Sequence, residues 1–190
     1  YVLGFKNSGL GSGASLSHPH CQVIAMPVVP PRVEQELGRA MRHFATTGRC
    51  LYCDLIRREM GRPELVVCEN RDFAVVCPEA PILAWHTMVY PKSHSPLFPS
   101  ESDARLASLA AVVHRSLAAL ESALDNPPYN VIIHSAPIAS DPLADDAYHW
   151  YMEILPRVTT VGGFEWGTGC FINHMHPERS AEVLRRHLPG

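Results

Sequence analysis

Ser17-His18-Pro19-His20-Cys21-Gln22 follows a segment of small residues at 7–15, Asn-Ser-Gly-Leu-Gly-Ser-Gly-Ala-Ser. On a β-strand, side chains two residues apart point to the same face, so His18 and His20 are predicted to project together. Pro19 lacks a backbone N–H and therefore suits an edge strand. The upstream glycines let backbone N–H groups approach an anion closely. The stretch therefore indicates phosphorus chemistry at a histidine.

Composition limits the classes of function that the chain can have. Its 190 residues are 46% apolar and 18% charged, enough for one full domain with a buried core. The net charge of −3 gives no electrostatic case for binding nucleic acid or an anionic membrane. No apolar run approaches the ~20 residues that span a membrane, and the first residues lack a secretory signal. The sequence therefore predicts a cytoplasmic protein.

The cysteines indicate one special site. Six cysteines are too few for a disulfide scaffold in a chain of this length. The pair Cys50-x-x-Cys53 is typical of a metal site or a redox site. No thioredoxin-like βαβ pattern surrounds this pair, which favours the metal interpretation.

Hydrophobic patterning predicts the fold class. The helix expected at 101–124 carries leucine and valine at separations of three and four, with Ser100 and Asp103 as its cap. Further helices are expected at 33–44 and 177–188, and strands at 1–5, 18–25, 64–68, 73–77, 83–90, 129–135 and 148–155. This order favours an α+β fold in which helices lie on one face of an antiparallel sheet.

Several short motifs share one family resemblance. Asn7, Ser15, His18, His20 and Gln22 stand at separations that resemble the active-site segment of the galactose-1-phosphate uridylyltransferase family, a branch of the histidine-triad superfamily. The resemblance continues through 50–53, 91–94, 127–130, 149–156 and 163–169. It implies that residues 1–30 end a first histidine-triad-like domain and that residues 31–190 form a second one. The chain thus looks like a C-terminal portion whose first half is absent.

The resemblance implies roles for the residues of the active-site segment. His20 is similar to the nucleophile, a neutral imidazole that attacks an α-phosphorus and carries the nucleotidyl group between two displacements. Gln22 stands where related hydrolases carry a third histidine. Because an amide cannot shuttle a proton, transfer is favoured over hydrolysis. Gln22, Ser15 and Asn7 are expected to hydrogen-bond the phosphoryl oxygens.

Two zinc sites are also implied. Cys50, Cys53, His94 and His149 resemble a family quartet of two thiolates and two imidazoles, which suits tetrahedral zinc and leaves no position open for water. We expect this site to be structural. His18 resembles the ligand that completes the zinc site of the first domain, whose other three ligands would come from the missing half.

Segment 163–169 resembles the hexose-phosphate loop, which in the dimers of this family reaches into the site of the partner subunit. Phe164, Glu165 and Trp166 are therefore candidate sugar contacts. Thr168-Gly169 stands where the best-known galactose enzymes carry a tyrosine-glutamate pair, and this version also looks like plant ADP-glucose phosphorylases. The acceptor sugar stays open at this point.

The leading functional hypothesis is a nucleotidylyltransferase of galactose metabolism. It would move UMP from UDP-glucose to a hexose 1-phosphate, with galactose 1-phosphate expected, through a uridylyl-histidine at His20. The alternatives are an ADP-glucose or dinucleoside polyphosphate phosphorylase or adenylyltransferase, and a non-catalytic, zinc-stabilised half that needs a separate N-terminal partner. The expected partners are a nucleotide sugar, a hexose 1-phosphate, and a second copy of the chain or an N-terminal half.

Overall fold

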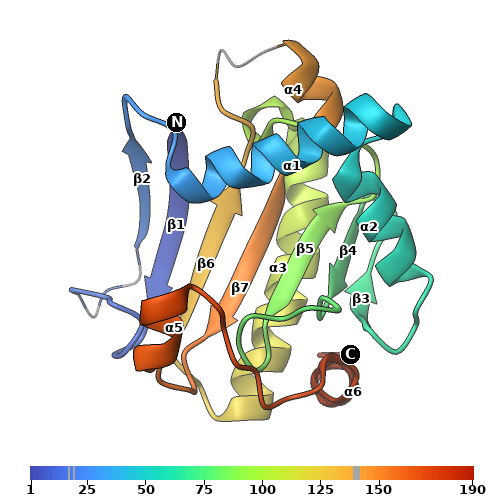
Figure 1. Cartoon of the computed structure of the whole chain (residues 1–190). Coiled ribbons are helices and arrows are strands. Elements are labelled where there is room, and N and C mark those ends of the chain that lie inside the picture. Colours follow the sequence, from blue (N-terminus) through green and yellow to red (C-terminus); the bar gives the residue numbers. More distant parts are fainter. Residues whose placement is uncertain (17, 19, 139–141) are drawn as a thin grey trace.

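A single antiparallel sheet forms the centre of the molecule (Figure 1). The computed structural model describes residues 1–16, 18, 20–138 and 142–190. Within them, seven strands pair in the order β2-β1-β6-β7-β5-β4-β3. The strands are β1 (Val2–Ser8), β2 (Cys21–Ala25), β3 (Val66–Glu69), β4 (Phe73–Val76), β5 (Thr87–Pro91), β6 (Tyr129–His134) and β7 (Tyr151–Pro156). The antiparallel sheet and the α+β class that the sequence predicts are confirmed.

Helices cover both faces of the sheet. They are α1 (Pro31–Thr47), α2 (Leu51–Met60), α3 (Asp103–Leu124), α4 (Pro142–Ala147), α5 (Gly163–Thr168) and α6 (Pro177–Arg186), with a 3-10 turn at Phe98–Ser100. Val75 of β4 is buried in the core between the sheet and helices α3 and α6. Its neighbour Val76 is buried in a second core, between the sheet and helices α1 and α2. The expectation of helices on one face is thus incomplete. Successive strand side chains point to opposite faces, so a strand that is apolar throughout needs a cover on each.

Helix α3 follows the predicted pattern closely. Leu109, Val112 and Leu120 are buried in the same core as Phe73 and Ile154 of the sheet. The cap lies two residues after the predicted Ser100, because Ser102 accepts a hydrogen bond from the backbone N–H of Arg105 at 3.4 Å. Ser100 belongs to the preceding 3-10 turn.

Three helices were not expected from the sequence. Helix α2 begins directly after Cys50 and buries Tyr52, Ile56 and Glu59, which recur at separations of four and three. The other two, α4 and α5, have six residues each. A helix of six residues has fewer than two turns, so its apolar residues do not repeat often enough to reveal a helical period.

The first 30 residues belong to the same sheet as the rest. Gly4 of β1 pairs with Val23 of β2 on one side and with Ile133 of β6 on the other. The division into domains at 1–30 and 31–190 stays a prediction. Among the described residues, no helix has both the length and the apolar character needed to cross a membrane.

Replacing Ile154 with alanine should destabilise the fold strongly. The side chain is 1% exposed on β7, between β5 and β6. We expect Ile154→Ala to lower the free energy of unfolding by about 2–5 kcal/mol, because it leaves a cavity in the main core. Urea unfolding followed by circular dichroism measures this loss.

Ile172→Ala is the matched control, because Ile172 is 53% exposed. It should change the free energy of unfolding by no more than about 0.5 kcal/mol. Equal losses in the two variants would contradict the placement of the core.

Candidate functional site

A glycine-rich loop leaves the end of β1. Gly9, Gly11 and Gly13 have φ angles of 79°, 89° and 85°, which residues with a Cβ adopt only under strain. At Gly9 a Cβ would also come within 3.2 Å of Pro128. The loop borders a hollow of about 310 Å³, lined by Gly9, Leu10, Ala14, Ser15 and Leu16. The glycines therefore allow a tight backbone around a space large enough for an anion.

Two asparagines hold this loop in place. The side-chain amide of Asn130, on β6, donates to Asn7 Oδ1 at 2.7 Å and to the carbonyl oxygen of Ser12 at 2.8 Å. Asn7 Nδ2 in turn lies 3.4 Å from the carbonyl oxygen of Gly13. From the sequence, Asn7 is predicted to belong to the site and Asn130 has no assigned role. An asparagine in a largely apolar strand is the available signal for it.

The histidine pair lies before the strand rather than on it. Pairing with β1 starts at Cys21, which is opposite Lys6, so the prediction that His18 and His20 share one strand face is wrong. After Lys6, β1 stays paired with β6 as far as Ser8 and has left β2. Pro19 lies outside the described residues.

A backbone contact of the His20 ring indicates which nitrogen of the neutral imidazole carries the hydrogen. His20 Nδ1 lies 2.9 Å from the carbonyl oxygen of His18. A carbonyl oxygen only accepts hydrogen bonds, so Nδ1 carries the proton in this contact and the lone pair is on Nε2. His20 is half-buried and the His18 side chain is exposed. The geometry therefore leaves one ring nitrogen of His20 free to act as a nucleophile.

The other predicted phosphate contacts lie on the same hairpin. Gln22 is half-buried on β2 opposite Phe5, and Ser15 lines the hollow beside the glycine-rich loop. Asn7, Ser15, His20 and Gln22 thus all come from β1, β2 or the connection between them. Their catalytic and substrate-binding roles stay predictions.

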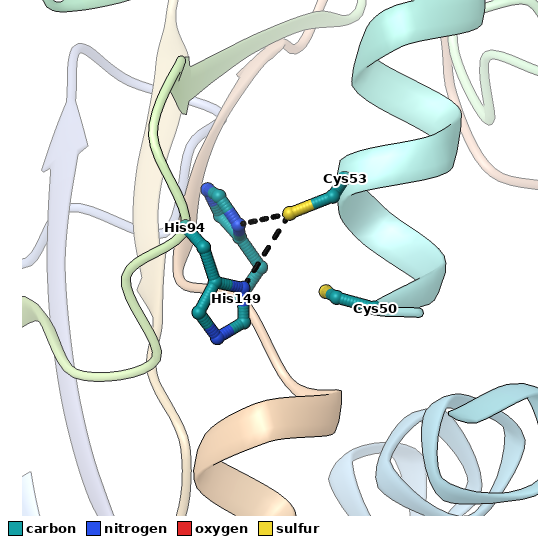
Figure 2. Close-up of side chains that lie close together, drawn as sticks. All are labelled: Cys50, Cys53, His94 and His149. Carbon is teal, nitrogen blue, oxygen red and sulfur yellow. Dashed lines mark hydrogen bonds between the residues drawn. The ribbon is translucent and has the colours of Figure 1, made fainter. Parts of the chain in front are cut away.

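A second site brings together four side chains far apart in the sequence. Figure 2 shows Cys50, which directly precedes α2, and Cys53 on α2 facing His94, which follows β5, and His149, which precedes β7. The ligand atoms of all four lie within 4.8 Å of one another. Cys53 Sγ is 3.4 Å from His94 Nδ1 and 3.5 Å from His149 Nδ1. This group of residues is able to hold a metal ion.

The surroundings of the cluster orient its ligands. His94 Nε2 donates to the carbonyl oxygen of Asp145 at 2.8 Å, and His149 Nε2 donates to that of Pro91 at 3.0 Å. Each ring therefore turns its unprotonated Nδ1 toward the thiols, the arrangement that fixed metal ligands need. The hydrogen bond with Cys53, then those with His149 and His94, lowers the pKa of the Cys50 thiol. The donor set thus fits a thiophilic divalent ion.

The cluster and the glycine-rich loop lie at opposite ends of the sheet (Figure 1). Pro156, the last residue of β7, aligns with Tyr129 and through it with Ser8, where the loop begins. His149 lies before the other end of β7, which starts at Tyr151. A six-residue strand is ~20 Å long. A metal ion in the cluster therefore supports the sheet without touching a ligand at the loop.

A buried ionic centre, which was not predicted from the sequence, lies between the two ends. Glu153 is 2% exposed on β7 and accepts hydrogen bonds from Arg32 Nη2 at 2.9 Å and from His134 Nε2 at 2.8 Å. Burial alone would raise the pKa of Glu153, but His134 and Arg32 outweigh it and lower the pKa to about 2. His86 Nε2 lies 3.5 Å from the same carboxylate. A glutamate within an apolar strand was the only sequence signal.

Segment 163–169 forms helix α5 instead of a loop. Phe164 and Trp166 are 54% and 78% exposed, whereas Glu165 Oε2 accepts from the N–H of Gly162 at 2.9 Å and caps the helix. Gly169, with φ of 70°, closes its other end. The chain leading to α5 leaves β7 at the same end of the sheet as the glycine-rich loop (Figure 1). The sugar contacts proposed for this segment stay predictions.

Comparisons with known proteins place this geometry in a family. A family model described as a domain of unknown function (DUF4921) matches residues 1–188. The chain belongs to this family. Its similarity to galactose-1-phosphate uridylyltransferases confirms the family resemblance that the sequence motifs predict. One of these, from Thermotoga maritima, is 28% identical to the DUF4921 chain over 192 residues, which is 97% of the chain and 59% of that protein.

An ADP-glucose phosphorylase is more similar to the DUF4921 chain. The enzyme from Arabidopsis thaliana is 37% identical over 185 residues, or 97% of this chain and 51% of that protein. The crystal structure of an ADP-glucose phosphorylase from the same plant with bound ADP-glucose has a TM-score of 0.90 at 36% identity, over 97% of this chain and 57% of that one. The DUF4921 chain thus spans about half the length of the curated relatives it matches.

More distant structures show the fold alone. A histidine-triad-like protein from Bartonella henselae aligns with 73% of the DUF4921 chain and 95% of its own length, with a TM-score of 0.52 at 21% identity. The predicted histidine-triad-like fold is therefore confirmed.

The buried Glu153 should make the fold sensitive to acid. Its folded pKa is depressed, so its contribution to stability is fully present above the unfolded pKa of ~4.3 and is lost as the pH falls toward about 2. The loss is on the order of 3 kcal/mol, and Glu153→Gln should make the pH dependence of stability shallower in this window. Urea unfolding at a series of pH values measures it. A slope that Glu153→Gln leaves unchanged would contradict the assigned ionic centre.

Proposed function

We propose that this chain carries the nucleophile and phosphate-binding loop of a nucleotidyl-transferring enzyme, with His20 as the attacking residue. The contact between His20 Nδ1 and the carbonyl oxygen of His18 carries the proposal, because it leaves the Nε2 lone pair free. Membership of a family related to galactose-1-phosphate uridylyltransferases and an ADP-glucose phosphorylase supports it.

The reaction divides into two displacements. His20 Nε2 attacks the α-phosphorus of a nucleotide sugar, and the bond from that phosphorus to the oxygen bridging to the β-phosphate breaks. Hexose 1-phosphate leaves with the electron pair, and the nucleotidyl group stays on the imidazole. An oxygen of a phosphate acceptor then attacks the same phosphorus and releases the ring in its original form.

Neighbouring groups stabilise the charge on the phosphoryl oxygens. Asn7 lies just before the glycine-rich loop, and Ser15 lies within it. Gln22 lies two residues after His20. Each offers hydrogen-bond donors to oxygens that gain charge during attack. Because Gln22 cannot take a proton from water, it favours transfer to a phosphate acceptor over hydrolysis.

The substrate has two candidate forms. The hypothesis from the sequence is UMP transfer from UDP-glucose to a hexose 1-phosphate, with galactose 1-phosphate expected. The alternative is a phosphorylase or adenylyltransferase that acts on ADP-glucose or a dinucleoside polyphosphate. The identity of 37% with an ADP-glucose phosphorylase supports the second form, as does Thr168-Gly169 at the end of α5. Turnover of UDP-glucose and of ADP-glucose under identical conditions distinguishes them.

The proposal includes partners and a location. The exposed Phe164 and Trp166 of α5 suit contact with the site of a second copy, in a homodimer or a complex with a separate N-terminal half. We propose a cytoplasmic location and no nucleic-acid or membrane partner, as composition predicts.

His20→Ala should abolish a covalent intermediate. We expect nucleotide sugar labelled at the α-phosphorus to leave acid-labile label on His20 of the wild-type protein, and none on the variant, because the alanine has no ring nitrogen. Denaturing electrophoresis followed by peptide mapping measures it.

The matched control is His114→Ala, an exposed histidine on α3, which should keep the label. Label that persists in His20→Ala would disprove the nucleophile. Label that appears only after addition of an N-terminal half would favour the alternative in which this chain is inactive alone.

We also propose that zinc occupies the cluster of Cys50, Cys53, His94 and His149. Two thiolates and two imidazoles complete a tetrahedron, so the ion would hold α2 to the segments before β7 and after β5. It has no open position and takes no part in the reaction. His18 is proposed as one ligand of a second zinc site.

Cys53→Ser should remove the metal and lower stability. We expect bound zinc to fall from about one ion per chain to nearly none, because one thiolate ligand is lost. We also expect the melting temperature to fall by several degrees, in line with a loss of ~1–3 kcal/mol. Elemental analysis and calorimetry measure both. Cys170→Ser, at an exposed cysteine outside the cluster, is the control and should change neither.

A further inference from the structure

We infer that Asn130 is a positioning residue, which fixes the atom of Asn7 that faces a bound phosphate. The inference rests on the proposed function, because it concerns the same phosphate site. Asn130 lies on β6 directly opposite Asn7 on β1 and is half-buried. It contacts the loop from the sheet and has no place among the residues proposed to react.

The amide of Asn130 uses both of its hydrogens. One donates to Asn7 Oδ1 at 2.7 Å and the other to the carbonyl oxygen of Ser12 at 2.8 Å. Ser12 is only 8% exposed, and its hydroxyl donates to the carbonyl oxygen of Gly9 at 2.8 Å. A single amide therefore ties the last turn of the loop to the strand from which the loop starts.

This arrangement determines the orientation of the Asn7 amide. Its oxygen is taken by Asn130, so the amide cannot turn over without losing the shorter of the two contacts. Among the residues that the structure describes, its nitrogen has one long contact of 3.4 Å, to the carbonyl oxygen of Gly13. A phosphate has acceptors alone and needs donors around it. Asn130 thus presents the donor end of Asn7 to the loop and keeps the oxygen, which would repel an anion, away.

The contact with Ser12 lowers the cost of binding. Gly9, Gly11 and Gly13 have wide conformational freedom in an unbraced chain, and a loop ordered on binding loses affinity by the entropy of that ordering. Asn130 fixes Ser12 between two of these glycines before any ligand arrives. Asn130 should therefore raise the affinity for an anion in two ways, by orienting Asn7 and by ordering the loop.

The first test compares ligands with and without phosphate. We expect Asn130→Ala to weaken ADP binding about tenfold, with adenosine changed less than twofold, because only ADP has the phosphates that Asn7 would contact. UDP and uridine form the parallel pair. In an Asn7→Ala background, the further effect of Asn130→Ala on ADP should fall below threefold. Isothermal titration calorimetry on the full chain measures the affinities for ADP, adenosine, UDP and uridine.

Asn70→Ala is the matched control. The Asn70 amide also braces two elements, with contacts of 2.9 Å and 3.0 Å to Ser108 on α3, but it lies at the turn before β4. It should leave ADP binding unchanged. Equal weakening of ADP and adenosine by Asn130→Ala would show general damage to the fold and overturn the inference, as would a full effect in the Asn7→Ala background.

A measurement without ligand separates this inference from the proposed function. Nitrogen-15 relaxation should show the Asn7 side-chain amide and the backbone amides of Gly11 and Gly13 ordered in the wild-type chain and mobile in Asn130→Ala. Unchanged relaxation would overturn the inference whether or not ADP binds. If the wild-type chain bound neither ADP nor UDP while the variant loosened the loop, the proposed function would fail for the isolated chain and the positioning role would stand.

Discussion

The register of β6 between β1 and β7 is the constraint on which the other features depend. It aligns Ser8, Tyr129 and Pro156 in one row, so the glycine-rich loop and the chain leading to α5 leave the sheet at the same end. It also places Asn130 opposite Asn7. A slip of one residue would turn every side chain of β6 to the other face and separate the two amides. The proposed phosphate site is thus a consequence of strand pairing in the centre of the sheet.

The opposite end of the sheet is held by contacts between side chains rather than by strand register. There the ligands of the metal cluster come from α2, from the segment after β5 and from the segment before β7, so one ion would join three parts of the chain. Between the two ends, Arg32 extends from α1 to the buried Glu153 on β7. A buried carboxylate is costly unless it is paired, so this contact fixes α1 on its face of the sheet. Contacts between residues far apart in sequence therefore hold this part of the sheet to its helices.

The features that could be predicted from the sequence are those that leave a pattern in neighbouring residues. The leucine period over 101–124 is visible because α3 is long, and the cysteine pair and the histidines are visible because their chemistry is rare. Where β2 begins depends on the residue at which β1 stops pairing with β2 while it stays paired with β6, which no local pattern records. The ionic centre at Glu153 joins residues 121 positions apart, so its partners follow only from the fold. Asn130 matters for the same reason, since its partners lie on another strand and in the loop that follows that strand.

The division between a braced end and a loop end follows from what phosphate binding requires. Backbone amides approach an anion most closely where side chains are absent, and the glycines that allow this carry the largest entropy of ordering. A hydrophobic brace cannot reduce that cost beside an anion, because it would leave buried backbone groups without partners. A half-buried amide such as Asn130 satisfies two carbonyl oxygens and adds no charge. Polar bracing from a paired strand is therefore the form of support that the chemistry of this loop permits.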